Sequence, residues 1–172
     1  MGEGGVRTPF FMQWPKKIKP KITYDNPVSS FDIFATMKSI INPDLELPNK
    51  IHGKNILPYV LGEKPGAPHE SLFWKINGDF KIVNNDTIRG NDRFAIRSKN
   101  YKMIIDEDGN SYLYDLEKDI SEQNNIALDF PEITNDLRSK IKQWNEKTIN
   151  PIFLGLSNNE LYNQLNPDRF KY

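Results

Sequence analysis

Residues 94–116, FAIRSKNYKMIIDEDGNSYLYDL, decide the fold of this chain. The stretch contains three runs of β-branched and aromatic residues, separated by two short polar segments with turn-forming residues, Lys99-Asn100 and Asp108-Gly109. Short apolar runs joined by such segments are typical of consecutive β-hairpins. The stretch therefore predicts three neighbouring strands of an antiparallel sheet.

The first of these strands alternates in character along its length. Phe94 and Ile96 face one side, while Ala95 and Arg97 face the other, because successive side chains of a strand point in opposite directions. We therefore expect one face of the sheet to be packed against a core and the opposite face to meet water.

Two further elements are expected to complete this sheet region. Residues 71–76 predict another strand, which follows a boundary rich in glycine and proline. A helix is predicted from Pro131, because proline suits the first turn of a helix. Its inward stripe has helical spacing and consists of Ile133, Leu137, Ile141, Trp144 and Thr148. We expect this helix to lie across the sheet.

The N-terminal part has a different pattern. Residues 3–10, EGGVRTPF, predict a tight Gly-Gly turn, and residues 10–14 then predict an interior strand, since they are apolar on both faces. Ser29 and Asp32 have the spacing of a helix-capping pair, and the helix that follows is apolar almost all round as far as Ile41. Such a helix needs burial on more than one side. We therefore expect both elements to pack inside a larger polypeptide that precedes residue 1.

Together these elements indicate an α/β fold in two parts. Residues 1–70 are expected to be the C-terminal end of an α/β domain, with a short helical turn at 56–61. Residues 71–149 are expected to form a small antiparallel β-sheet subdomain with one covering helix. The polar segment 150–172 stays unassigned.

The composition excludes several classes of function. The chain has 172 residues with 23 basic and 23 acidic side chains, and this net charge of +0 gives no general attraction to nucleic acid or to an anionic membrane. No segment is long and apolar enough to span a membrane. The absence of cysteine rules out disulfides, thiolate metal sites and a cysteine nucleophile within this chain.

Five segments, taken in order, resemble the C-terminal portion of the formylglycine-dependent sulfatases of the alkaline phosphatase superfamily. They are residues 3–10 with Trp14-Pro15, 28–36, 53–62, 94–97 with Tyr101-Lys102, and 113–116 with Asp119, Glu122 and Asn125. The chain departs from the family pattern at Ala35, where proline is usual, and at His52, where aspartate is usual. The resemblance implies that the first part ends an alkaline-phosphatase-like α/β domain.

The resemblance also implies hydrolysis of sulfate esters, with a formylglycine hydrate as the nucleophile and Ca²⁺ held by oxygen ligands. In the family the nucleophile is made from the first residue of a Cys/Ser-x-Pro-x-Arg motif, which this chain lacks. The family's metal ligands, catalytic histidines and sulfate-binding lysine all precede the Glu-Gly-Gly-x-Arg segment. We therefore expect no catalytic residue, no metal ligand and no bound cofactor in this chain.

Four residues are candidates for the rim of a substrate pocket: His69, Arg89, Asn91 and Arg93. Arginine and asparagine side chains suit hydroxyl and sulfate groups, and histidine ionises near neutral pH. The alternative is a surface loop for His69 and a flexible hairpin loop over residues 77–92. His52 is expected on a surface loop.

The loop formed by Glu3, Gly4, Gly5 and Arg7 borders the sulfate pocket in the family that the chain resembles. A structural role is favoured for all four residues. Glu3 and Arg7 are expected to form an ion pair that holds the turn, and the two glycines are expected to serve its backbone geometry.

Four lysines lie close together in the connector after this loop, namely Lys16, Lys17, Lys19 and Lys21. They form a basic patch that suits a polyanionic sugar. A solvated connector explains them equally well.

The leading hypothesis is the C-terminal fragment of a sulfatase, a sulfuric ester hydrolase whose parent desulfates a carbohydrate, and the fragment alone is expected to be inactive. Its expected partners are the N-terminal catalytic portion of the same enzyme and the sulfated carbohydrate, with no nucleic acid. One alternative is a non-catalytic module that binds sulfated glycans, and another is a related phosphodiesterase or phosphonate hydrolase. The chain does not indicate its compartment; the resemblance suggests the periplasm or the cell exterior for the intact family member.

Overall fold

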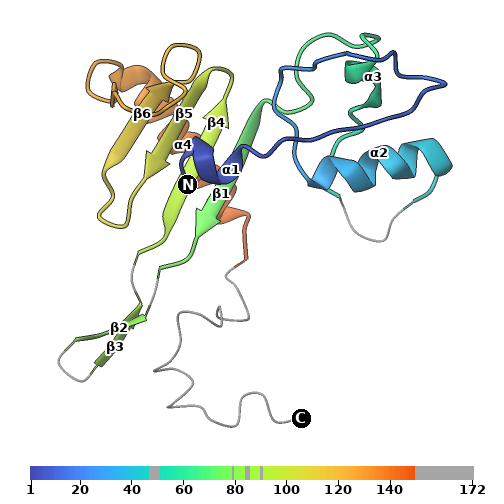
Figure 1. Cartoon of the computed structure of the whole chain (residues 1–172). Helices are drawn as coiled ribbons and strands as arrows, with labels where there is room; N and C mark the ends of the chain where they lie inside the picture. Colours follow the sequence, from blue (N-terminus) through green and yellow to red (C-terminus); the bar gives the residue numbers. More distant parts are fainter. Residues whose placement is uncertain (47–50, 79, 84–85, 90, 150–172) are drawn as a thin grey trace, which may run out of the picture. The chain divides into compact units, whose positions relative to one another are not determined.

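The computed structural model describes residues 1–46, 51–78, 80–83, 86–89 and 91–149. They divide into two compact units, which are described separately (Figure 1). The sheet unit combines Met1–Val6 with the chain from Phe73 onwards, and the helical unit is Arg7–Leu72. The division at residue 70 stays a prediction, and the segment 150–172 lies outside the described residues.

The sheet unit is built on four strands in the order β1-β4-β5-β6. They are β1 (Ser71–Ile76), β4 (Arg93–Ser98), β5 (Tyr101–Ile105) and β6 (Ser111–Asp115). β5 pairs antiparallel with both β4 and β6. The turns on either side of β5 contain Lys99 and Gly109, with φ of 53° and 84°, a left-handed conformation that glycine adopts without strain. The strands predicted within 94–116 and at 71–76 are confirmed.

The helix α4 (Pro131–Glu146) covers one face of this sheet. Leu137 and Ile141 are buried among core residues of β4, β5 and β6. Trp144 stacks on Phe73 of β1, with the ring centroids 5.1 Å apart and the planes at 8°. The predicted covering helix is therefore confirmed, together with the inward orientation of its stripe.

The opposite face of the sheet is covered as well, so the prediction that it meets water is wrong. Ala95 and Lys102 on this face are both 0% exposed. The short helix α1 (Glu3–Val6) lies there, on the side of the sheet opposite α4 (Figure 1). Strand alternation reports which residues share a face, but it does not report what a distant segment later places on that face.

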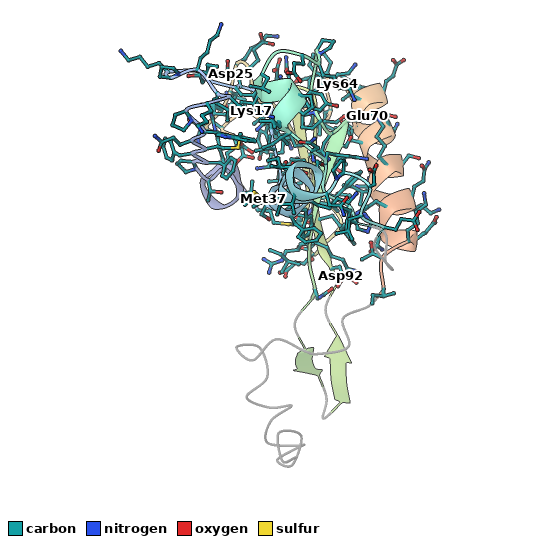
Figure 2. The ribbon with its side chains drawn as sticks, turned by 90° about the vertical axis from the view of Figure 1, so that its right-hand side faces the viewer. Lys17, Asp25, Met37, Lys64, Glu70 and Asp92 are labelled. Atoms are coloured by element: carbon teal, nitrogen blue, oxygen red, sulfur yellow. The ribbon has the colours of Figure 1, made fainter. Side chains whose placement is uncertain are left out.

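The segment 77–92, for which a flexible hairpin loop is an expected alternative, contains a hairpin with two paired strands. Its strands β2 (Phe80–Val83) and β3 (Asp86–Arg89) pair antiparallel in a separate two-stranded sheet. Asp92 lies at the base of the hairpin (Figure 2). Its carboxylate forms an ion pair with Lys75 at 2.9 Å and accepts a hydrogen bond from Gly78 N at 3.0 Å. These contacts join the two ends of the insertion to the main sheet.

The helical unit contains α2 (Phe31–Ile41) and α3 (Leu57–Val60). Asp32 accepts a hydrogen bond from Ser29 N at 2.7 Å, as the capping pattern predicts. Gly53 lies so close to the start of α2 that a Cβ there would overlap the Phe31 carbonyl. Both predicted helices of this unit are confirmed.

The predicted strand at residues 10–14 is wrong, because this segment has no regular secondary structure. It ends in a turn, in which the Trp14 carbonyl accepts hydrogen bonds from Lys17 N at 2.9 Å and Ile18 N at 2.7 Å. A strand needs a partner for its backbone groups, and the described residues provide none for this segment.

The helix α2 exposes much of its apolar surface, as the sequence predicts for this part of the chain by itself. Only Asp32, Ala35 and Thr36 of this helix are buried. Its exposed apolar residues are Phe31, Ile33, Phe34, Met37, Ile40 and Ile41. Figure 2 shows Met37 at this helix. In the described part of the chain, no helix is long and apolar enough to cross a membrane.

Candidate functional site

Four charged side chains meet in the sheet unit and form a group that is buried at Glu3 and Lys102 and partly buried at Arg97 and Glu122, here called the Glu3 cluster. Lys102 Nζ, fully buried, donates a hydrogen bond to Glu3 Oε1 at 2.9 Å and lies 2.9 Å from Glu122 Oε1. Arg97 Nη1 lies 3.5 Å from Glu3 Oε2. The four formal charges sum to zero, as a buried group of ions requires.

The strand register explains why two carboxylates are needed here. Arg97 on β4 is the direct partner of Lys102 on β5, and like charges opposite each other destabilise a sheet. The Glu3 carboxylate contacts both cations, and Glu122 supplies the second negative charge. Glu3 is predicted to pair with Arg7, and this prediction is wrong, because Lys102 and Arg97 are its partners.

Glu122 also fixes the beginning of α1. Its Oε2 accepts a hydrogen bond from Glu3 N at 2.6 Å. The first backbone N–H groups of a helix have no partner within the helix, so a negatively charged acceptor is favourable at this position. A Cβ at Gly2 would lie 2.7 Å from the same oxygen. A larger residue at position 2 would therefore displace the end of the Glu122 side chain from this contact.

Gly4 and Gly5 have no comparable constraint within the sheet unit. They lie in the helical turn of α1, in place of the predicted tight turn, and neither has a positive φ. A Cβ at either position would meet nothing within 4 Å in this structure. Gly4, Gly5 and Arg7 are all exposed. Their assignment to a pocket loop stays a prediction.

The polar residues Asp119, Glu122 and Asn125 after β6 each contact a different part of the sheet unit. The Asp119 carboxylate accepts hydrogen bonds from Asn124 N at 2.8 Å and Gln123 N at 2.9 Å, and these bonds hold the pKa of this carboxyl below its ordinary value of 3.8. Asn125 Oδ1 accepts from Leu113 N at 2.9 Å. The turn places Glu122, at φ of 56°, in contact with Lys102. Asp119, Glu122 and Asn125 therefore stabilise the fold of the sheet unit.

A second buried pair lies in the helical unit. His69 Nε2 lies 2.8 Å from both carboxylate oxygens of Asp32. Asp32 is fully buried and also accepts hydrogen bonds from Ser29 N and Lys54 N, both at 2.7 Å. One carboxylate thus joins the start of α2, the loop at Lys54 and the segment before β1. With Nε2 facing Asp32, the ring nitrogen that remains for another contact is Nδ1.

The remaining candidates for a pocket rim do not meet in one described site. Asn91 Nδ2 donates a hydrogen bond to the Glu107 carbonyl at 2.9 Å, which attaches it to the turn between β5 and β6. Arg93 begins β4 and is half-buried. The side chain of Arg89 lies outside the described residues. His52 is exposed in a loop, as predicted.

The described residues do not fit the calcium ion that the resemblance implies. Within the ranges that the structure covers, no three His, Cys, Asp or Glu side chains lie close enough together to hold a metal ion. The acidic turn at Asp106 is the β5–β6 hairpin turn, where the Asp106 carboxylate accepts hydrogen bonds from Asn110 N at 2.8 Å and Tyr112 Oη at 3.0 Å. No step of catalysis is therefore assigned to a metal in this chain.

Comparison with known proteins identifies the class. A family model described as "N-sulphoglucosamine sulphohydrolase, C-terminal" matches residues 1–147. The N-acetylgalactosamine-6-O-sulfatase of Bacteroides thetaiotaomicron is 31% identical over 137 residues, which are 78% of this chain and 26% of that protein. Human arylsulfatase A is 29% identical over 164 residues, covering 82% of this chain and 30% of that protein.

A solved structure shows the same fold. Ps i-CgsB in complex with k-i-k-neocarrahexaose has a TM-score of 0.63 at 18% identity, covering 88% of this chain and 32% of that chain. This chain therefore shares its fold with part of that structure. The chain belongs to the sulfatase family, and the part of the family that it matches is the C-terminal region. It spans about a quarter to a third of the length of these relatives.

Proposed function

We propose that this chain is the C-terminal portion of a sulfuric ester hydrolase that removes sulfate from a carbohydrate. The family match over residues 1–147 carries this proposal. The relative named as an N-acetylgalactosamine-6-O-sulfatase supports the carbohydrate class, since it is 31% identical over most of this chain. The formylglycine nucleophile and the calcium ligands then belong to the N-terminal catalytic portion, which is the partner of this chain.

In this proposal, the role of this chain is structural: it holds the Glu-Gly-Gly segment in position beside the catalytic portion. The Glu3 cluster attaches the Glu-Gly-Gly segment to the sheet through the ion pair of Glu3 with Lys102 at 2.9 Å and the hydrogen bond from Glu3 N to Glu122 at 2.6 Å. Exposed Gly4, Gly5 and Arg7 follow this anchor, and the absence of side chains at the two glycines allows another backbone to approach closely. His69, Arg89, Asn91 and Arg93 remain the proposed rim residues, with His69 oriented by Asp32.

The experiment combines this chain with the coding sequence that lies upstream of it. We expect that sequence to encode a Cys/Ser-x-Pro-x-Arg motif, and the two portions together to release inorganic sulfate from N-acetylgalactosamine 6-sulfate. A steroid sulfate and an aryl sulfate serve as comparison substrates. Alanine at the first residue of the motif is the matched inactive control. Sulfate release by the 172-residue chain alone, or an upstream sequence without the motif, would overturn the proposal.

A further inference from the structure

The lysines of the connector form an exposed cationic surface in the helical unit. Lys16, Lys17, Lys19 and Lys21, here called the connector lysines, are all exposed. They place four positive charges within six residues of a chain whose net charge is +0. Figure 2 shows Lys17 among the side chains of the helical unit. The charge on this segment is therefore a local concentration within a neutral molecule.

None of these four amines has a carboxylate partner among the described residues, and the same is true of Lys99, Lys142 and Lys147; the connector lysines differ in lying within six residues of one another, whereas four other lysines are paired. Lys75, Lys102, Lys118 and Lys140 each lie within 3.2 Å of an Asp or Glu oxygen. The ring of Trp14 lies 4.8 Å from Lys17 Nζ, and this contact leaves the positive charge in place. The connector lysines thus keep their charge available to a ligand in solution.

The backbone that carries them is held in a defined shape. The Trp14 carbonyl accepts hydrogen bonds from Lys17 N and Ile18 N, which closes a turn at the start of the segment. Pro15 and Pro20 restrict φ at two positions, and Lys21 has a left-handed φ of 62°. A segment ordered before binding loses less conformational entropy when a ligand binds.

The spacing of the charges fits a linear polyanion. Six residues extend over at most about 20 Å, which is about two Debye lengths at 0.1 M salt. An extended polymer with an anionic group on successive units contacts several of these amines at once and releases condensed counterions, as nucleic acids do. An isolated anion would gain little, because each exposed ion pair contributes only about 0–1 kcal/mol.

We propose that the connector lysines bind a sulfated polysaccharide. The choice of this polyanion rests on the proposed function, since a sulfatase for carbohydrates encounters sulfated sugar chains. The amines, the turn and the contact with Trp14 supply the binding surface itself. Binding of this kind increases the time that a polymer stays on the enzyme, and it does not require any catalytic group.

The test measures binding of the purified 172-residue chain to heparin and chondroitin sulfate oligosaccharides at several salt concentrations. One variant replaces the four connector lysines by glutamine. A matched control replaces Lys99, Lys118, Lys142 and Lys147, four exposed lysines of the sheet unit, by glutamine and changes the net charge equally. We expect the connector variant to bind at least tenfold more weakly, and its slope of log K against log salt to fall by up to about 3.6, given about 0.9 for each of the four contacts. The control should stay close to the parent chain.

Three outcomes would overturn the inference: no binding by the parent chain, equal weakening in both variants, or duplex DNA that binds the connector lysines as tightly as the glycans. Circular dichroism establishes that all variants keep the fold. The assay involves no sulfate release, so it separates this inference from the proposed function. Glycan binding by this chain without hydrolysis by the combined portions would count against only the proposed function. Hydrolysis without glycan binding by this chain would count against only the inference about the connector lysines.

Discussion

Lys102 shows how much one residue of this chain depends on distant partners. Its side chain is fully buried, it lies opposite Arg97 in the sheet, and its two carboxylate partners come from residues 3 and 122. Removing an ammonium group from water costs several kcal/mol unless close opposite charges compensate it. The Glu3 cluster is therefore a condition for closing this face of the sheet.

Replacing Glu3 by glutamine tests this dependence, because it keeps the shape of the side chain and removes its charge. We expect the free energy of unfolding to fall by about 3 kcal/mol, the lower end for breaking a buried ion pair, since Glu122 remains beside Lys102. Urea denaturation followed by circular dichroism measures the change. As a control, Lys118→Gln breaks an ion pair in which Lys118 is 82% exposed, and the loss should be below about 1 kcal/mol. Equal losses in the two variants would contradict the assigned role of the cluster.

At the scale of elements, α4 and α2 differ in how this chain covers them. In α4 the apolar stripe packs on the sheet, and Leu137 and Ile141 are 2% and 3% exposed. In α2 most apolar residues are exposed, with Phe31 at 69% and Ile41 at 76%. Packing of an apolar face supplies most of the stability of a helix in a protein. The covered α4 is therefore the helix that stabilises this chain.

The substitution Leu137→Ala tests the packing of α4. Because Leu137 is 2% exposed and lies in the core cluster, we expect the free energy of unfolding to fall by about 2–5 kcal/mol, from lost burial and a residual cavity. Leu128, which is 94% exposed, provides a control with the same chemical change. Leu128→Ala should alter the free energy by less than about 0.5 kcal/mol. Thermal and urea unfolding of both variants give the comparison, and a small effect at Leu137 would show that α4 does not support the sheet.

For the whole molecule, the exposed face of α2 has the character of an interface. Isolated soluble proteins seldom expose large continuous apolar patches, and such patches mark sites of association or aggregation. The proposed N-terminal catalytic portion is the occupant that fits the membership of this chain in the sulfatase family. Without it, the purified chain should self-associate through this face.

The double substitution Phe34→Glu and Ile41→Lys tests this expectation, since both residues are exposed, at 55% and 76%. We expect less self-association of the 172-residue chain in light scattering, with a change in the free energy of unfolding of less than about 0.5 kcal/mol per exposed site. The same variant should combine poorly with the catalytic portion. Leu128→Glu, a single exposed apolar residue outside α2, serves as the control. Unchanged self-association would exclude α2 as the interface.

Local pattern was sufficient for the elements that depend on neighbours in sequence. The strands within residues 94–116, the stripe of α4 and the capping of α2 by Asp32 follow from periodicity and from residues three or four positions apart. The order of the five segments along the chain also indicates the sulfatase family, since this resemblance depends on the sequence alone. These features can be predicted from the sequence because they depend on residues that are close together along the chain.

Only the tertiary structure decided the contacts between distant residues. Glu3 pairs with Lys102, 99 positions away along the chain, and His69 pairs with Asp32, 37 positions away. The predicted strand at residues 10–14 failed for the same reason, because a strand exists only where another strand accepts its backbone hydrogen bonds. The sequence predicted the main helices and strands of this chain, but it missed three elements: residues 10–14 form no strand, α1 takes the place of a predicted tight turn, and β2 and β3 lie within a predicted loop. The fold decided which charges are buried together, since burial and pairing depend on the position of every element at once.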